Sequence, residues 1–207
     1  MKPCQSPATI VQSSFSLKSW LDRRPSVEEA RPGQCPCCGA ASRPVGARLN
    51  LHGHGVRDRQ VRGPLEEGEA PQLVVVSLRR YLCCRCGGTM TVGPRGLIAR
   101  RLFSAAAIGV ALCLLGVVGL GAARVRHTVN PLLHVGPTAA QGWAQLGRWV
   151  QAVREGRLFR GLVRGPVPGA SRAGAQRVAL ALSTFSPPQM FPQSLPRQVF
   201  VGAAQAA

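Results

Sequence analysis

The feature that most constrains this chain is a repeated pair of cysteines. In each pair two residues separate the cysteines, and a glycine, Gly39 or Gly87, follows directly. A tight turn of this kind directs two sulfurs at one point, and glycine permits the left-handed backbone that the turn requires. Two turns place four thiolates at the corners of a tetrahedron, which suits Zn²⁺ best. The spacing therefore predicts one structural zinc ion, and its ligands are Cys35, Cys38, Cys83 and Cys86.

The remaining cysteines and two histidines lie outside this pattern. The first residues lack the features of a secretory signal, so we expect reduced thiols. Cys37 and Cys84 lack the two-residue spacing and are predicted to face outward, whereas Cys113 lies in an apolar run and behaves as a small hydrophobe. His52 and His54 are alternative ligands, although four thiolates already saturate a closed site.

The charge of the chain is strongly unbalanced. It has 26 Lys and Arg against 8 Asp and Glu, a formal net charge of +18. After residue 70 the only acidic residue is Glu155. Such a balance favours a polyanionic partner, and guanidinium groups suit phosphate and guanine. A GC-rich genome, which replaces Lys codons by Arg codons, is the alternative explanation for the arginines.

The residues between the two cysteine pairs predict β-structure. Residues 47–64 alternate weakly between apolar and polar, and 72–83 form a β-branched run between turn-forming residues. Glu66, Glu67 and Glu69 fit a solvated turn between strands better than a catalytic cluster. These patterns predict a zinc ribbon of two or three antiparallel strands within a domain at 31–96, in a small α+β protein.

Helices are predicted after this domain, over 97–164. Ser104 is the expected N-cap of a helix that runs to about Leu115, and residues 116–121 form a glycine-rich turn. A second helix follows over 122–129 and ends at Asn130 and Pro131, as in a helix-turn-helix. On this helix we expect Ala123, Val125 or Val129 to pack inward and four residues to face outward: Arg124, Arg126, His127 and Thr128.

A third helical segment and both termini complete the chain. Residues 138–157 place Trp143 and Trp149 at helical spacing, which favours the core of a small bundle over base stacking. Residues 165–207 contain six prolines and one short apolar run, so we expect a mostly disordered tail. Residues 1–30 are predicted to be flexible, apart from a short helix that docks through Phe15, Leu17 and Trp20.

Residues 102–123 also allow a membrane interpretation. They carry no charge, and about 20 apolar residues can cross a bilayer. However, Gly116, Gly119 and Gly121 lie in the second half of this stretch and suit a turn, and arginines flank both of its ends. We therefore prefer a cytoplasmic protein and keep a single-pass inner-membrane protein as the alternative.

Several of these motifs resemble a known family. The order C-P-x-C, then "HGHGVRDRQVRG", then "VVVSLRRYLCCRCGGTMTV" is similar to the N-terminal zinc-binding module of bacterial insertion-sequence transposases. Their second cysteine motif, R-R-Y-x-C-x-x-C-G-x-T, is matched from Arg79 to Thr89. The following segments resemble the helix-turn-helix part of a short, transposase-related bacterial family, so that the resemblance covers roughly residues 30–165.

This resemblance implies DNA binding without catalysis. In these transposases, three carboxylates that follow the zinc-binding and helix-turn-helix parts hold two Mg²⁺ ions. This chain has only Glu155 after residue 70, and one carboxylate cannot build such a site. His127 and His134 also lack an acidic residue nearby in sequence. We therefore expect no enzyme and no small-molecule substrate, but a DNA-binding protein that acts beside a separate transposase or nuclease. A membrane-anchored zinc ribbon and a protein-interaction adaptor remain the alternatives.

The residues expected to contact DNA fall into two groups. Phosphate contacts are assigned to two pairs of adjacent arginines, and base contacts to the second helix of the predicted helix-turn-helix. The first group is Arg79, Arg80, Arg100 and Arg101, and the second is Arg124, Arg126 and His127.

Overall fold

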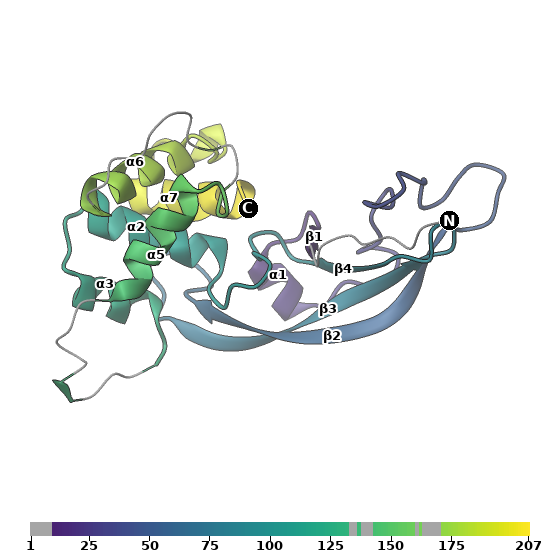
Figure 1. Cartoon of the computed structure of the whole chain (residues 1–207), viewed down its shortest axis with the longest axis horizontal. Coiled ribbons are helices and arrows are strands. Elements are labelled where there is room, and N and C mark those ends of the chain that lie inside the picture. Colours follow the sequence, from purple (N-terminus) through teal and green to yellow (C-terminus); the bar gives the residue numbers. More distant parts are fainter. Residues whose placement is uncertain (1–9, 133–135, 138–142, 160–161, 163–170) are drawn as a thin grey trace. The chain divides into compact units, whose positions relative to one another are not determined.

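The computed structural model describes residues 10–132, 136–137, 143–159, 162 and 171–207. In these residues the fold is mixed α+β, with a four-stranded sheet and six α-helices (Figure 1). The chain divides into two compact units, one of residues 1–60 and 75–101 and one of residues 61–74 and 102–207. This differs from the predicted division, because the stretches at 97–164 and 165–207 fall almost entirely into a single unit.

The sheet consists of β1 (Ile10–Gln12), β2 (Leu51–Gly63), β3 (Gln72–Cys83) and β4 (Thr89–Gly93), in the order β1-β4-β3-β2. β3 pairs antiparallel with β4, and Tyr81 lies opposite Met90. β1 pairs parallel with β4, which the sequence did not predict. The far ends of β2 and β3, with the turn that joins them, belong to the second unit. Glu66, Glu67 and Glu69 lie in this turn, as expected.

The core of the first unit lies against β3 and β4. Its buried residues include Tyr81, whose hydroxyl donates to the carbonyl of Val27 at 2.7 Å. The guanidinium of Arg79 donates twice to the carbonyl of Pro25, at 2.9 and 2.7 Å. These contacts fasten the segment that precedes the first cysteine pair onto β3. The buried cluster is Cys35, Leu51, Tyr81, Cys83, Met90 and Val92.

The predicted short helix that docks through Trp20 is present, but the flexibility expected for the rest of residues 1–30 is wrong from Ile10 onward. Helix α1 (Leu17–Asp22) begins at Ser16, whose hydroxyl accepts from the Ser19 amide. Trp20 on this helix is buried, and its indole N–H donates to the carbonyl of Ser77 at 3.1 Å. Burial of this large ring, together with the pairing of β1, provides the free energy that orders the segment. Residues 1–9 lie outside the described part.

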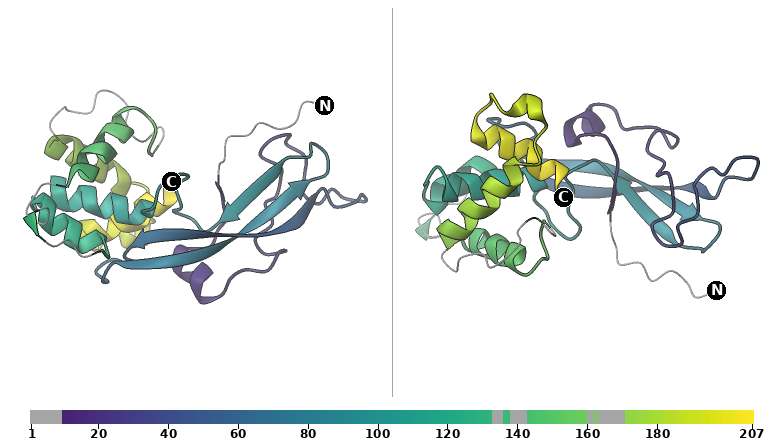
Figure 2. Two further views of the ribbon diagram at one scale, coloured as in Figure 1. Left: turned by 60° about the horizontal axis from the view of Figure 1, so that its bottom comes forward. Right: turned by 90° about the horizontal axis from the view of Figure 1, so that it is seen from above.

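The second unit is built around α2 (Ala105–Gly116), which is buried over residues 105–113. The helix begins as predicted at Ser104, whose hydroxyl accepts from the Ala107 amide at 3.1 Å. Four helices pack against or beside α2 (Figure 2). They are α3 (Ala122–Val129), α5 (Ala144–Arg154), α6 (Ser171–Ser183) and α7 (Leu195–Gln205), with a short 3₁₀ helix, η1 (Pro188–Met190).

The prediction of a disordered tail is wrong for residues 171–207. In Figure 2 the yellow-green α6 and the yellow α7 lie against the teal α2. Small residues allow this close approach: a Cβ on Gly116 would lie 2.2 Å from the Gln176 backbone nitrogen, and one on Gly109 would lie 2.6 Å from the Ala203 Cβ. Pro196 falls in the first turn of α7, where proline costs no hydrogen bond.

A cluster of three aromatic rings joins α5 to the residues before α2. Phe103, Trp143 and Trp149 meet edge to face, with ring centroids 5.1 to 5.8 Å apart. Trp149 is buried and Trp143 is half-buried. The prediction that the tryptophans belong to a helical core is therefore confirmed. Residues 138–142 of the predicted segment lie outside the described part.

The apolar stretch 102–123 does not form one long helix. Helix α2 ends at Gly116, and the amide of Leu120 bonds back to the carbonyl of Leu114 at 2.9 Å. Helix α3 then begins after Gly121, which provides no side-chain cap. Among the described residues, none of the helices has the length and apolarity needed to cross a membrane.

Candidate metal centre

The first cysteine pair lies in a tight turn that follows the segment fastened to β3. The amide of Gly39 donates to the carbonyl of Cys35 at 2.9 Å, and the amide of Cys35 donates to the carbonyl of Ala40 at 2.9 Å. Gly39 has a φ of 68°, the left-handed conformation that the sequence predicted for it. This backbone brings the sulfurs of Cys35 and Cys38 to the same side of the turn.

The second pair repeats this geometry between β3 and β4. The amide of Gly87 donates to the carbonyl of Cys83 at 2.8 Å, and the amide of Cys83 donates to the carbonyl of Gly88 at 2.9 Å. Gly87 also has a φ of 68°. Because β3 and β4 pair directly on either side of this turn, the sheet holds the sulfurs of Cys83 and Cys86 in place.

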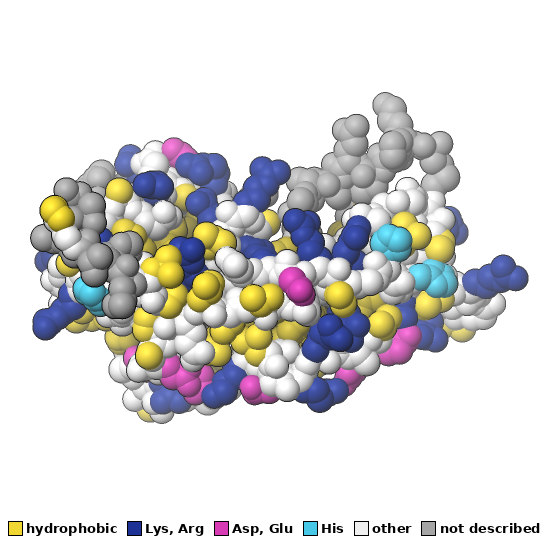
Figure 3. Space-filling model, turned by 90° about the horizontal axis from the view of Figure 1, so that it is seen from below, with side chains coloured by type: hydrophobic (Ala, Val, Ile, Leu, Met, Phe, Trp, Pro, Cys, Tyr) yellow, Lys and Arg dark blue, Asp and Glu magenta, His cyan; other side chains and the backbone are white. Residues whose placement is uncertain are grey.

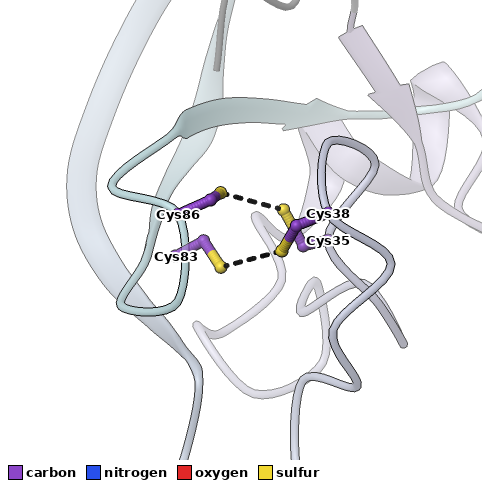
Figure 4. Close-up of side chains that lie close together, drawn as sticks. All are labelled: Cys35, Cys38, Cys83 and Cys86. Atoms are coloured by element: carbon purple, nitrogen blue, oxygen red, sulfur yellow. Dashed lines mark hydrogen bonds between the residues drawn. The ribbon is translucent and has the colours of Figure 1, made fainter. Parts of the chain in front are cut away.

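The two turns face one another and bring the four sulfurs together (Figure 4). All four lie within 4.8 Å of one another. Sγ of Cys35 is 3.8 Å from Sγ of Cys86, and Sγ of Cys38 is 3.7 Å from Sγ of Cys83. In a tetrahedral site with Zn–S bonds of about 2.3 Å, neighbouring sulfurs lie about 3.8 Å apart. The four thiols therefore form a possible metal site, and these two separations match those of zinc.

Electrostatics explain why this cluster favours a cation. The backbone N–H of Ala40 lowers the pKa of Cys38 to about 7. The N–H of Gly88 also lowers the pKa of Cys86, but burial and the three neighbouring thiols outweigh it and raise that pKa to about 12. Burial likewise raises the pKa of Cys35. Four thiolates this close repel one another, and a bound divalent cation relieves this repulsion.

Asn50 connects the two turns and was not identified from the sequence. Its carbonyl accepts from the amide of Cys84 at 2.9 Å, in the second turn. Its side-chain amide donates to the carbonyl of Ala41 at 2.8 Å, just after the first turn. The only local signal was an asparagine directly before β2, which is common at any strand end.

The other cysteines and the two histidines lie outside the cluster. Cys84 is an exposed free thiol, and Cys113 is buried in α2, both as predicted. Cys37 is exposed but disulfide-bonded, which corrects the expectation that it is a spare reduced thiol. His52 and His54 are exposed on β2, and His52 Nε2 donates to the carbonyl of Leu49 at 2.8 Å.

In the first unit, the predicted phosphate contacts differ in how accessible they are. Arg100 is exposed, while Arg80 and Arg101 are half-buried. Arg79 is also half-buried, and Nε and Nη2 of its guanidinium donate to the carbonyl of Pro25, so the side chain also fastens the preceding segment to β3.

In the second unit, α3 carries the predicted base contacts. Arg124 and His127 are exposed. Arg126 is only 5% exposed and lies on the buried side of the helix with Val125 and Val129, which corrects its assignment to an outward face. The physical reason is that residues three apart in a helix lie on the same side, and Arg126 is three residues before the buried Val129.

Comparison of the chain with protein-family models, with curated proteins and with solved structures finds no match.

Proposed function

We propose that this protein binds DNA without catalysis and that one structural Zn²⁺, held by Cys35, Cys38, Cys83 and Cys86, stabilises its first unit as a zinc ribbon. The observation that carries DNA binding is the charge imbalance of +18, much of it on exposed arginines. Figure 3 shows Lys and Arg side chains spread over much of the face in view. A surface of this kind attracts the phosphates of nucleic acid at long range.

A structural role for the metal is supported by the donor set. Four thiolates close a tetrahedral site and leave no position for water or substrate, as in other structural zinc sites. Two sulfurs come from each of two turns that are far apart in sequence, so a bound ion ties residues 35–38 to the sheet at residues 83–86. In small modules a zinc ion can supply about 10 kcal/mol or more of folding free energy.

A helix-turn-helix role is proposed for α2, the turn at 117–121 and α3. In support, α3 leaves the side chains of Arg124, His127 and Thr128 exposed. These are residue types that contact base edges and phosphates. The burial of Arg126 narrows the candidate surface to these three residues.

The proposal excludes strand cleavage by this chain itself. After residue 70, Glu155 is the only carboxylate side chain, and its oxygens interact with Gln151 and Arg157. A two-metal site needs several carboxylates. Together with the resemblance to insertion-sequence transposases, this favours a transposase-derived or transposon-associated protein that works beside a separate nuclease.

Fluorescence anisotropy of the zinc-loaded full chain with a duplex of mixed sequence tests DNA binding. Affinity should fall steeply with salt, because each neutralised phosphate releases condensed counterions. Complete absence of binding at about 50 mM salt would reject DNA binding and favour the adaptor hypothesis.

Two variants of α3 test the helix-turn-helix part. Arg124→Ala should reduce discrimination between sequences selected from a random pool and unselected ones, by about 1–3 kcal/mol for a bidentate base contact. Arg126→Ala is the matched change on the buried side, and it should lower thermal stability while preserving sequence preference. If Arg124→Ala leaves both affinity and preference unchanged, α3 does not enter a groove.

A further inference from the structure

A group of arginines in the first unit is held together by one side chain. The guanidinium of Arg59, on β2, donates to the carbonyls of both Ile98 and Arg101. Arg59 therefore fastens the segment 98–101 to β2. Residues two apart on a strand lie on the same face, so Arg57 shares the face of β2 from which Arg59 reaches the segment that carries Arg100 and Arg101.

The backbone of this segment is strained at an arginine. The amide of Arg101 donates to the carbonyl of Ile98 at 3.2 Å, which closes a turn with Arg100 at its third position. Arg100 has a φ of 60°, where turns normally place glycine or asparagine. The left-handed conformation costs an ordinary residue about 1–2 kcal/mol. An exposed, charged side chain at such a position points to a role for the side chain itself.

Positive charge accumulates here without compensation. Within the described part of the chain, none of the ion pairs includes Arg57, Arg59, Arg100 or Arg101. Burial and the neighbouring charge of Arg57 lower the pKa of Arg59. Asp58 lies between Arg57 and Arg59 in sequence, but it is on the opposite face of the strand and accepts a hydrogen bond from the Ser77 hydroxyl.

We propose that Arg57, Arg100 and Arg101 form a phosphate-binding site for the backbone of duplex DNA, with Arg59 as the residue that positions them. This inference rests on the proposed function and assigns one site to it. Guanidinium groups bind phosphate oxygens in pairs, and several such groups gathered without carboxylates gain most from a ligand that carries closely spaced negative charges. DNA is favoured as the source of the phosphates because the whole chain, and not this site alone, is strongly basic.

The test compares two double variants that remove the same charge. Arg57→Gln/Arg100→Gln removes two of the proposed contacts, and Arg24→Gln/Arg48→Gln removes two exposed arginines elsewhere in the same unit that have no partner in the described structure. Binding of the zinc-loaded full chain to a duplex is measured between about 50 and 200 mM salt. The first variant should flatten the slope of log affinity against log salt by about 1.8, and the control by much less.

A third variant tests the role of Arg59. Arg59→Met should also flatten the slope, because Arg100 and Arg101 are no longer held beside Arg57. A purely structural role would lower the thermal midpoint and leave the slope unchanged, which would overturn the positioning role.

Each outcome separates this inference from the proposed function. If the wild-type protein binds DNA and both double variants change the slope equally, the site is wrong although DNA binding stands. If the wild type does not bind DNA, the proposed function itself fails. Binding of the wild type to anionic phosphatidylserine vesicles, with loss in the first double variant and no binding to DNA, would replace DNA by a membrane surface and overturn the assignment.

Discussion

The packing of α6 against α2 can be tested with a single methyl group. A Cβ added at Gly116 would lie 2.2 Å from the Gln176 nitrogen and 2.6 Å from the Gln176 Cα. Both are backbone atoms of α6, so no side-chain rotation can relieve the overlap. Gly147, within α5, has no atom within 4 Å of the same position, and it is the matched control.

The two substitutions should have opposite signs. In an open helical position, replacing glycine by alanine stabilises by about 0.5–1 kcal/mol, because glycine loses more backbone entropy on folding. At Gly116 overpacking costs about 1–3 kcal/mol and outweighs this gain. Gly116→Ala and Gly147→Ala should therefore differ in the free energy of unfolding by the overpacking cost, about 2 kcal/mol, which corresponds to about 4–8 °C in Tm for a chain of this length.

Thermal and urea unfolding of the full-length variants, followed by circular dichroism at the helical band, measures this difference. Gly147→Ala should unfold at or above the wild-type midpoint and Gly116→Ala clearly below it. If Gly116→Ala is as stable as Gly147→Ala, α6 does not pack on α2, and the original expectation of a disordered tail would be right for residues 171–183.

Three further results are expected. Elemental analysis should find about one zinc per chain, lost in Cys35→Ser and retained in Cys84→Ser; full zinc and full thermal stability in Cys35→Ser would contradict the four-sulfur site. Burial raises the pKa of Cys113 to about 11, so alkylation of the folded protein at pH 8 should modify Cys84 and spare Cys113. Cys113 should react only as the pH approaches 11 or after unfolding, and mass spectrometry of the labelled peptides checks this. Ser104→Ala should lower the free energy of unfolding by about 1 kcal/mol because α2 loses its N-cap, whereas Gly121→Ser should raise it by a few tenths of a kcal/mol because α3 gains one. Equal unfolding midpoints for these two variants would contradict the assigned caps.

Local patterns in the sequence were sufficient wherever a few neighbouring residues determine the structure. The spacing of the cysteines and the glycine after each pair determine a turn that directs two sulfurs together, and the four sulfurs were identified correctly. Ser104 marked the start of α2, and the glycines after Leu115 marked its end. In each case the information lies within about five residues of the chain, so no knowledge of distant contacts was needed.

Only the tertiary structure decided which surfaces are covered. Ala175, Ala179 and Ala203 contribute little hydrophobic signal, yet they let α6 and α7 approach α2 closely, and this burial outweighs the ordering entropy that had predicted disorder. The packing of α3 against α2 covers one side of α3, and Arg126 is buried on that helix. A hydrogen bond from Arg59 to a turn about 40 residues later is equally invisible in the sequence, because a long-range contact leaves no periodic pattern in the residues that make it.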